Sequence, residues 1–123
     1  MSDLANEGAG PLLDRELVDQ IKSIGHATGR EDLLAGFVIK LEANIANFQK
    51  TFSDCMARGD NAGAGRAVHS LKGASRQLGA RALGELFADI ERSAKAGDYA
   101  EAQRIFEAGA SLIAQTIEAL KRA

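Results

Sequence analysis

Residues 67–75 read Ala-Val-His-Ser-Leu-Lys-Gly-Ala-Ser, and the pattern of this stretch predicts an α-helix with two different faces. Successive helical residues lie about 100° apart, so the small and aliphatic side chains collect on one half of the helix. The residues of this apolar face are Ala64, Ala67, Val68, Leu71, Ala74 and Leu78. His69 lies on the opposite half. The helix is therefore expected to pack into a core on one side and to present a histidine to solvent on the other.

Two glycines flank the histidine on the exposed half, Gly65 one turn before it and Gly73 one turn after it. A glycine inside a helix costs roughly 1 kcal/mol relative to alanine. Two such residues beside one histidine predict backbone left bare for the close approach of a partner. The alternative for each glycine by itself is a tolerated weak point in the helix.

Cationic and polar side chains surround the same histidine. Lys72 would tend to keep the imidazole of His69 neutral, which leaves a nitrogen lone pair available as a nucleophile. The same ammonium group would attract a phosphoryl group and offset its charge. Arg66 and Arg76 add positive potential to this face, and the amide of Gln77 can hydrogen-bond the imidazole or a visiting backbone. These surroundings suit phosphoryl acceptance better than acid–base hydrolysis.

The whole chain predicts five amphipathic helices with apolar residues three and four apart, including the helix that carries His69. A short first helix is capped by Asp14 and runs to about Ile24. The longest helix opens with the capping-box pair Thr28 and Glu31 and stops at Gly59. The bounds of the remaining three are Asp60 or Asn61 to about Gly79, about Ala80 to Ala96 with Gly97 as the stop, and a capping box at Asp98 and Glu101 to about Leu120.

Long helices joined by short turns predict an all-α fold, an antiparallel up-down-up-down four-helix bundle with an additional short N-terminal helix packed across it. The only proline, Pro11, precedes every predicted helix, so the strongest helix breaker is absent from them. Residues 1–11 are aperiodic and are expected to form a flexible leader. Residues 12–123 are expected to form a single domain.

Composition excludes several classes of function. The net charge of -2 gives no general attraction to nucleic acid or to an anionic membrane. The chain has no apolar run long enough to span a bilayer, and residues 1–10 do not resemble a signal peptide. The single cysteine, Cys55, cannot form an internal disulfide and is expected to be a buried, reduced thiol, typical of a cytoplasmic protein.

Other chemistries fit the histidine less well. A metal site needs several ligands, and the only other histidine, His26, lies in a predicted turn away from ligand spacing. The sequence has no nucleophile elbow of the serine hydrolases. In a phosphate-binding P-loop the lysine directly follows the closing glycine, whereas here Lys72 precedes Gly73.

The stretch 67–75, followed by Leu78-Gly79-Ala80, resembles the signature of the histidine-containing phosphotransfer (HPt) domain. That signature has a lysine three residues after the histidine, a glycine four after it, a small residue six after it and then a Gly-Ala pair. The similarity continues through Leu83 and Leu86 to Ile90-Glu91, and the predicted bundle covers residues 12–120.

The resemblance implies roles for individual residues. His69 would be phosphorylated on the imidazole nitrogen farther from the main chain, Lys72 would help to hold the phosphoryl group, and Gly73 would leave room for the partner's active-site loop. Glu91 stands where family members often have a polar residue, frequently glutamine, that binds the nearer ring nitrogen. It would orient the ring and raise its basicity; the alternative is a solvated helix charge. Ser75 lies near the apolar side and is interpreted as a packing or back-bonding hydroxyl.

The resemblance also implies a function, in which His69 exchanges a phosphoryl group with the aspartate of response-regulator receiver domains in a phosphorelay. The protein would be a phosphoryl carrier, not an enzyme, without a kinase or nucleotide site, downstream of a hybrid sensor histidine kinase. It would hold no cofactor, because the His69 face has no acidic cluster and Mg²⁺ would come from the receiver. A cytoplasmic monomer is expected. The alternatives are a docking module that binds a receiver or kinase without carrying phosphate, a structural or oligomerising bundle and, less well supported, a DNA-binding protein.

Overall fold

The computed structural model describes residues 12–123, and all regular structure in this part of the chain is helical, which confirms the all-α prediction. The helices are α2 (Arg15–Ala27), α3 (Leu33–Arg58), α4 (Asn61–Gln77), α5 (Arg81–Lys95), α6 (Tyr99–Ala108) and α7 (Ala110–Arg122). The leader predicted for residues 1–11 lies outside the described residues. Within residues 12–123, none of the helices is long and apolar enough to cross a membrane.

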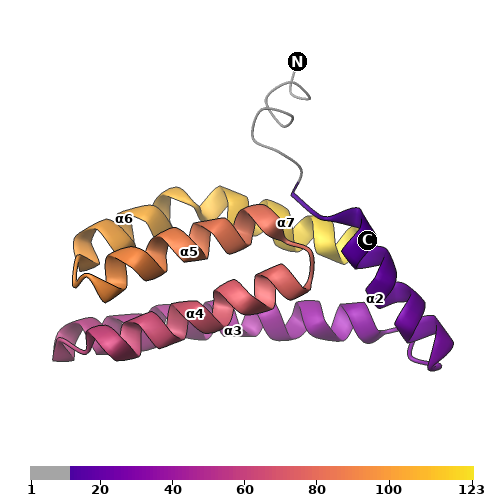
Figure 1. The fold of residues 1–123 in the computed structure, drawn as a ribbon, viewed down its shortest axis with the longest axis horizontal. Coiled ribbons are helices and arrows are strands. Elements are labelled where there is room, and N and C mark those ends of the chain that lie inside the picture. Colours follow the sequence, from indigo (N-terminus) through magenta and orange to yellow (C-terminus); the bar gives the residue numbers. More distant parts are fainter. Residues whose placement is uncertain (1–11) are drawn as a thin grey trace, which may run out of the picture.

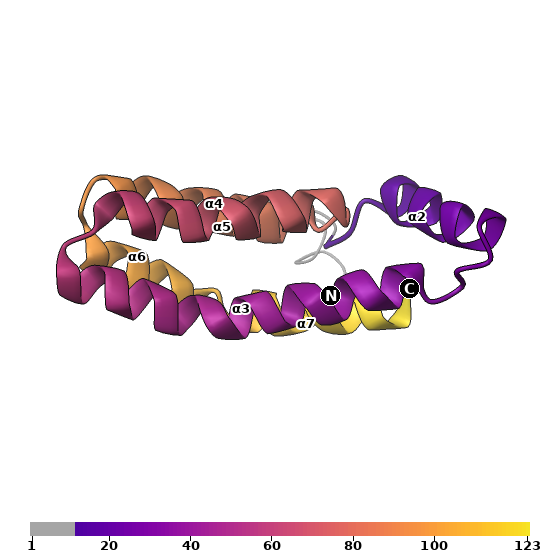
Figure 2. The same cartoon turned by 90° about the horizontal axis from the view of Figure 1, so that it is seen from below.

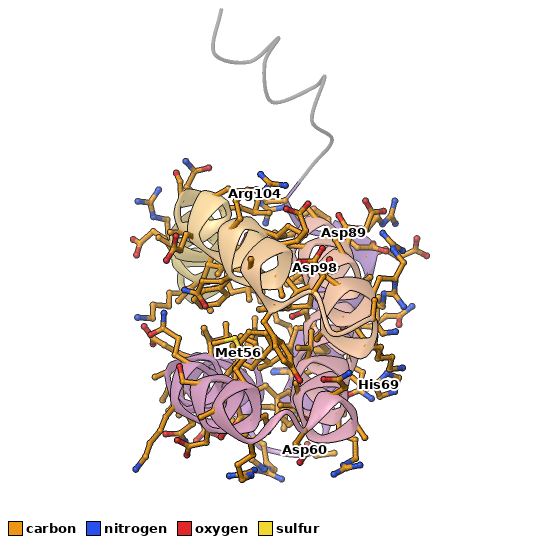
Figure 3. The ribbon with its side chains drawn as sticks, turned by 90° about the vertical axis from the view of Figure 1, so that its left-hand side faces the viewer. Met56, Asp60, His69, Asp89, Asp98 and Arg104 are labelled. Carbon is orange, nitrogen blue, oxygen red and sulfur yellow. The ribbon has the colours of Figure 1, made fainter. Side chains whose placement is uncertain are left out.

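Four columns of helix form the bundle, and they are α3, α4, α5 and the pair α6–α7. Consecutive columns pack side by side, and α7 returns to contact α3, so the bundle closes. Viewed along its axis, it has one column at each corner (Figure 3). Short turns join the columns, so neighbours run antiparallel as predicted. The most extensive contact joins α4 and α5.

Phenylalanine rings from three columns meet in the core. The ring centroid of Phe48 on α3 lies 5.1 Å from that of Phe52, 5.4 Å from that of Phe106 on α6 and 6.4 Å from that of Phe87 on α5. The apolar face predicted for α4 packs against this core, with Val68 fully buried. The opposite face of α4 is therefore the exposed one.

Local signals set most helix ends as predicted. Gly59, Gly79 and Gly97 have φ angles of 68°, 79° and 78°, the left-handed conformation that ends a helix. Asp60 Oδ1 accepts a hydrogen bond from the backbone N–H of Gly63 at 2.8 Å and so caps α4. Asp98 caps α6 in the same way, accepting from the N–H of Glu101 at 3.1 Å.

The capping box predicted at Thr28 and Glu31 is wrong. The hydroxyl of Thr28 donates to the carbonyl oxygen of Ile24 at 2.8 Å, at the end of α2, beside the backbone N–H of the same threonine at 3.0 Å, so this side chain bonds back to α2 and does not cap α3. Glu31 instead lies 2.7 Å from Nδ1 of His26. As a result, α2 extends to Ala27 and α3 begins only at Leu33.

The last helix was predicted to be continuous, but it breaks at Gly109 into α6 and α7. A Cβ atom on Gly109 would lie 2.6 Å from Cδ2 of Leu86 on α5, so the leucine packs directly on bare backbone. The N–H of Gly109 is shared between the carbonyl oxygens of Ile105 and Phe106, at 2.9 and 3.2 Å. The break thus lies where a side chain from another helix requires a glycine.

The additional N-terminal helix is present as α2, at one end of the bundle (Figures 1 and 2). The N–H of Asp14 donates to the carbonyl oxygen of Gly79 in the α4–α5 turn at 2.6 Å. A Cβ on Gly79 would lie 2.9 Å from the carbonyl oxygen of Asp14, so this contact also depends on glycine. Arg81 pairs with the Asp14 carboxylate at 3.2 Å. The α4–α5 turn thereby holds the start of α2.

Candidate functional site

His69 lies midway along α4, on the side turned away from the core. Its side chain is 66% exposed, whereas Val68 and Leu71 behind it are buried. Seen along the bundle axis, the imidazole lies on the outer surface beside α5 (Figure 3). The predicted separation of an apolar face from a histidine face is therefore present.

The carboxylate of Glu91 on α5 binds the imidazole of His69. Its carboxylate is only 6% exposed, and Oε2 lies 3.1 Å from Nδ1 of His69. A carboxylate can only accept, so Nδ1 carries the hydrogen and donates it. In a neutral ring Nε2 then keeps the lone pair. Glu91 is buried against the site and is not a solvated charge.

Two lysines bind the same carboxylate. Nζ of Lys72 lies 2.7 Å from Oε1 of Glu91, and Nζ of Lys95 lies 2.7 Å from Oε2. Burial by itself would raise the pKa of Glu91, but hydrogen bonds from Lys72, Lys95 and His69 outweigh it and lower the pKa from 4.5 to about 2. Glu91 is therefore ionised at neutral pH.

Lys95 is the site residue that sequence reasoning missed. It follows Glu91 by four residues, a spacing that brings opposite charges together on a helix, and this signal was available in the sequence. Lys72 lies on the same face of α4 as His69, but its side chain does not extend freely into solvent. Its side chain is 20% exposed, because it reaches across to α5 and binds Glu91.

The two flanking glycines differ from each other. A Cβ on Gly73 would meet nothing within 4 Å, so the backbone there is bare as predicted. Gly65 is buried, and its Cβ would lie 2.9 Å from Cγ and 3.1 Å from Cε of Lys95. The prediction of bare backbone at Gly65 is wrong, because the alkyl chain of Lys95 covers it.

The remaining predicted residues do not all lie beside His69. Arg66 is exposed and lines a shallow depression beside His69, together with Gly65 and Lys95. Arg76 is exposed, and its alkyl chain lies on Gly84 of α5. Gln77 lies about two helical turns from His69, on a separate groove, so the amide is not placed to bind the imidazole.

The Hpt domain family model matches residues 32–123, which include the whole bundle and every predicted site residue. The chain belongs to the Hpt domain family. Membership places it among the proteins of histidine phosphotransfer in phosphorelays, whose Hpt domains interact with receiver domains. No curated protein and no solved structure matches the chain significantly.

An apolar groove of about 290 Å³ opens at the α2 end of the Hpt bundle, and we call it the α2–α3–α4 groove. Its lining residues are Ile21, Phe37, Lys40, Leu41, Asn44, Ala74, Gln77 and Leu78. Phe37 is 43% exposed, which is unusual for so large an apolar side chain. The groove and His69 share helix α4.

Among residues 12–123, every buried side-chain nitrogen and oxygen atom has a hydrogen-bond partner. Ser75 is fully buried and donates to the carbonyl oxygen of Leu71 at 2.8 Å, which confirms the back-bonding interpretation. Cys55 is buried in the core, as predicted. Over residues 12–123, histidine, cysteine and acidic side chains form no cluster of three or more that could hold a metal ion.

Proposed function

We propose that this Hpt domain carries a phosphoryl group on Nε2 of His69 and exchanges it with the aspartate of response-regulator receiver domains. The observation that carries the proposal is the pairing of an exposed imidazole with a buried carboxylate at 3.1 Å from Nδ1. This contact fixes the ring and leaves Nε2 as the nitrogen available to a partner.

The transfer can be written with these groups alone on the Hpt side. The lone pair of Nε2 forms a bond to the phosphorus of the receiver's aspartyl phosphate, and the P–O bond to the aspartate breaks. The electron pair of that bond leaves with the aspartate carboxylate. The hydrogen stays on Nδ1, so positive charge develops on the ring, and the ionised Glu91 offsets it. The reverse transfer uses the same steps in the opposite order.

The charges near His69 support this assignment. Glu91 with Lys72 and Lys95 carries one net positive charge, and Arg66 beside the depression adds another. An attached phosphoryl group brings about two negative charges at neutral pH. In this proposal Mg²⁺ is supplied by the receiver, the protein is a carrier and not a kinase, and a hybrid sensor histidine kinase stands upstream.

The proposal is tested by incubating the protein with a phosphorylated receiver domain and measuring intact mass. We expect the mass of one phosphoryl group to be gained, in a linkage that is labile to acid and stable to base, as a phosphohistidine is. If receivers bind tightly but transfer nothing, the protein is a docking module, and the carrier role is rejected.

Replacing Lys72 by alanine is expected to slow transfer about ten- to a hundredfold. The substitution removes the charge-assisted hydrogen bond to Glu91, the carboxylate that orients His69, and a positive charge near the phosphoryl group, and one such bond contributes about 1.5–3 kcal/mol. Rapid-quench kinetics with a phosphorylated receiver measure the rate. The matched control is Lys50→Ala, which removes an exposed lysine on α3 and is expected to transfer at the wild-type rate. An unchanged rate in Lys72→Ala would remove this lysine from the mechanism.

We further propose that the receiver docks in the α2–α3–α4 groove. Replacing Phe37 by aspartate is expected to weaken receiver binding at least tenfold, because it removes a large apolar contact and buries a charge. Isothermal titration calorimetry measures the affinity. The matched control is Ile39→Asp, which changes an exposed apolar residue on the other side of α3. Equal effects of both substitutions would argue against docking in this groove.

A further inference from the structure

We propose that Lys95 is a phosphoryl-binding residue and that Gly65 is a glycine because the chain of Lys95 must lie across α4. In this proposal the ammonium group moves from Glu91 to a phosphoryl oxygen once His69 is phosphorylated. The inference rests on the proposed function, since it assigns a new residue to the same site.

The position of the ammonium group is the first argument. Lys95 Nζ binds Oε2 of Glu91 at 2.7 Å, and Nδ1 of His69 binds the same oxygen at 3.1 Å. Two groups that share one oxygen are held within a few ångströms of each other. Lys95 also lines the shallow depression beside the imidazole. Its ammonium group therefore lies next to the ring that would carry the phosphoryl group.

The freedom of the ammonium group is the second argument. The side chain of Lys95 is 61% exposed, compared with 20% for Lys72, and both bind the buried carboxylate. Lys72 holds the other oxygen, Oε1, so Glu91 keeps a cation when Lys95 leaves. Oε2 also keeps the hydrogen bond from Nδ1 of His69, which strengthens as the ring becomes positive. Lys95 can thus change partners without leaving the carboxylate unpaired.

Gly65 is the third argument. It has no left-handed φ angle and lies inside α4, where a glycine weakens the helix. The three heavy atoms nearest to its missing Cβ all belong to the Lys95 alkyl chain, at 2.9, 3.1 and 3.6 Å. A methyl group at residue 65 would push this flexible chain off α4. The glycine is thus explained by the contact that directs Lys95 toward His69.

The test uses protein phosphorylated on histidine by phosphoramidate, a small-molecule donor, and follows the phosphoryl group by ³¹P NMR during a pH titration. A nearby ammonium group favours the dianionic phosphoryl form, so Lys95→Ala is expected to raise the phosphoryl titration midpoint by about half a pH unit or more. Gly65→Ala is expected to raise it similarly although the lysine is still present. The double variant should show no larger shift than Lys95→Ala alone.

A second readout is the equilibrium of phosphoryl exchange with a receiver domain. We expect Lys95→Ala and Gly65→Ala each to shift it toward the receiver by about tenfold, and Lys95→Arg to restore most of the loss. Arg92→Ala on α5 and Gly36→Ala on α3 are the matched controls. Arg92 pairs with Asp89 at the surface, and a Cβ on Gly36 meets open space.

The outcomes separate this inference from the function on which it rests. If histidine is phosphorylated and both variants titrate and exchange like wild type, the role of Lys95 is rejected and the carrier role stands. If Lys95→Ala changes both readouts but Gly65→Ala changes neither, the explanation of Gly65 is rejected. Failure of phosphoramidate and of every phosphorylated receiver to label histidine would reject the proposed function itself.

Discussion

His69→Gln is expected to abolish phosphoryl incorporation and to leave the bundle folded. Glutamine has no ring nitrogen to form the P–N bond, so intact mass after incubation with a phosphorylated receiver should show no gain. The fold should persist because the side chain is 66% exposed and the buried residues of α4 lie on its other side. Circular dichroism should show the wild-type helix content and a melting temperature within a few degrees of wild type.

The matched control for this prediction is His26→Gln. His26 is the other histidine, exposed at the end of α2 and paired with Glu31, so this variant should be labelled like wild type. Labelling that persists in His69→Gln and disappears in His26→Gln would assign the phosphoryl group to His26 and reject the assignment to His69. A large loss of thermal stability in His69→Gln would contradict the surface position of the imidazole.

Glu91→Gln is expected to destabilise the fold at neutral pH and to do so progressively less in acid. The folded-state pKa of Glu91 is about 2, compared with 4.5 in the unfolded chain, because two lysines and the imidazole bind the carboxylate. A lowered pKa stabilises the fold fully above pH 4.5, and this stabilisation is lost as the pH falls from 4.5 to 2. At 1.36 kcal/mol per pH unit, the contribution is on the order of 3 kcal/mol.

Urea denaturation of wild type and Glu91→Gln at pH 7, 4 and 2.5 measures this contribution. The difference in free energy of unfolding should be largest at pH 7, smaller at pH 4 and reduced to roughly a quarter of its full value at pH 2.5. The control is Glu42→Gln, which removes an exposed carboxylate paired with Lys121 and should change stability by less than about 1 kcal/mol. A difference that is constant across the three pH values would mean that glutamine disturbs packing and that the charge contributes little.

Features that depend on neighbouring residues could be predicted from the sequence. The glycines that end α3, α4 and α5 act through their own backbone conformation, and Asp60 and Asp98 cap through atoms three residues away. The two faces of α4 follow from helical periodicity alone. Thr28 shows the limit of such signals, because a hydroxyl between two helices can serve either one.

Features that depend on distant residues could not be predicted in the same way. Gly109 and Leu86 come from different helices, and only packing brings them together to divide α6 from α7. The burial of Glu91, and with it the choice between a solvated charge and a ring-orienting carboxylate, depends on how α5 lies against α4. Gly65 illustrates the same point, because periodicity places it on the exposed half and only the contact with Lys95 covers it.

The residues proposed for phosphoryl chemistry and two of the residues that line the groove lie on different helices, and this affects how the sequence can diverge in evolution. Residues proposed for chemistry lie on α4 and α5, whereas Ile21 on α2 and Phe37 on α3 line the groove. The family match begins at residue 32, after α2. On the proposed docking in this groove, substitutions on α2 alter receiver binding without changing the residues proposed to carry the phosphoryl group. On this proposal, partner choice can change through α2 and α3 while the residues of α4 and α5 that serve the phosphoryl chemistry stay constant.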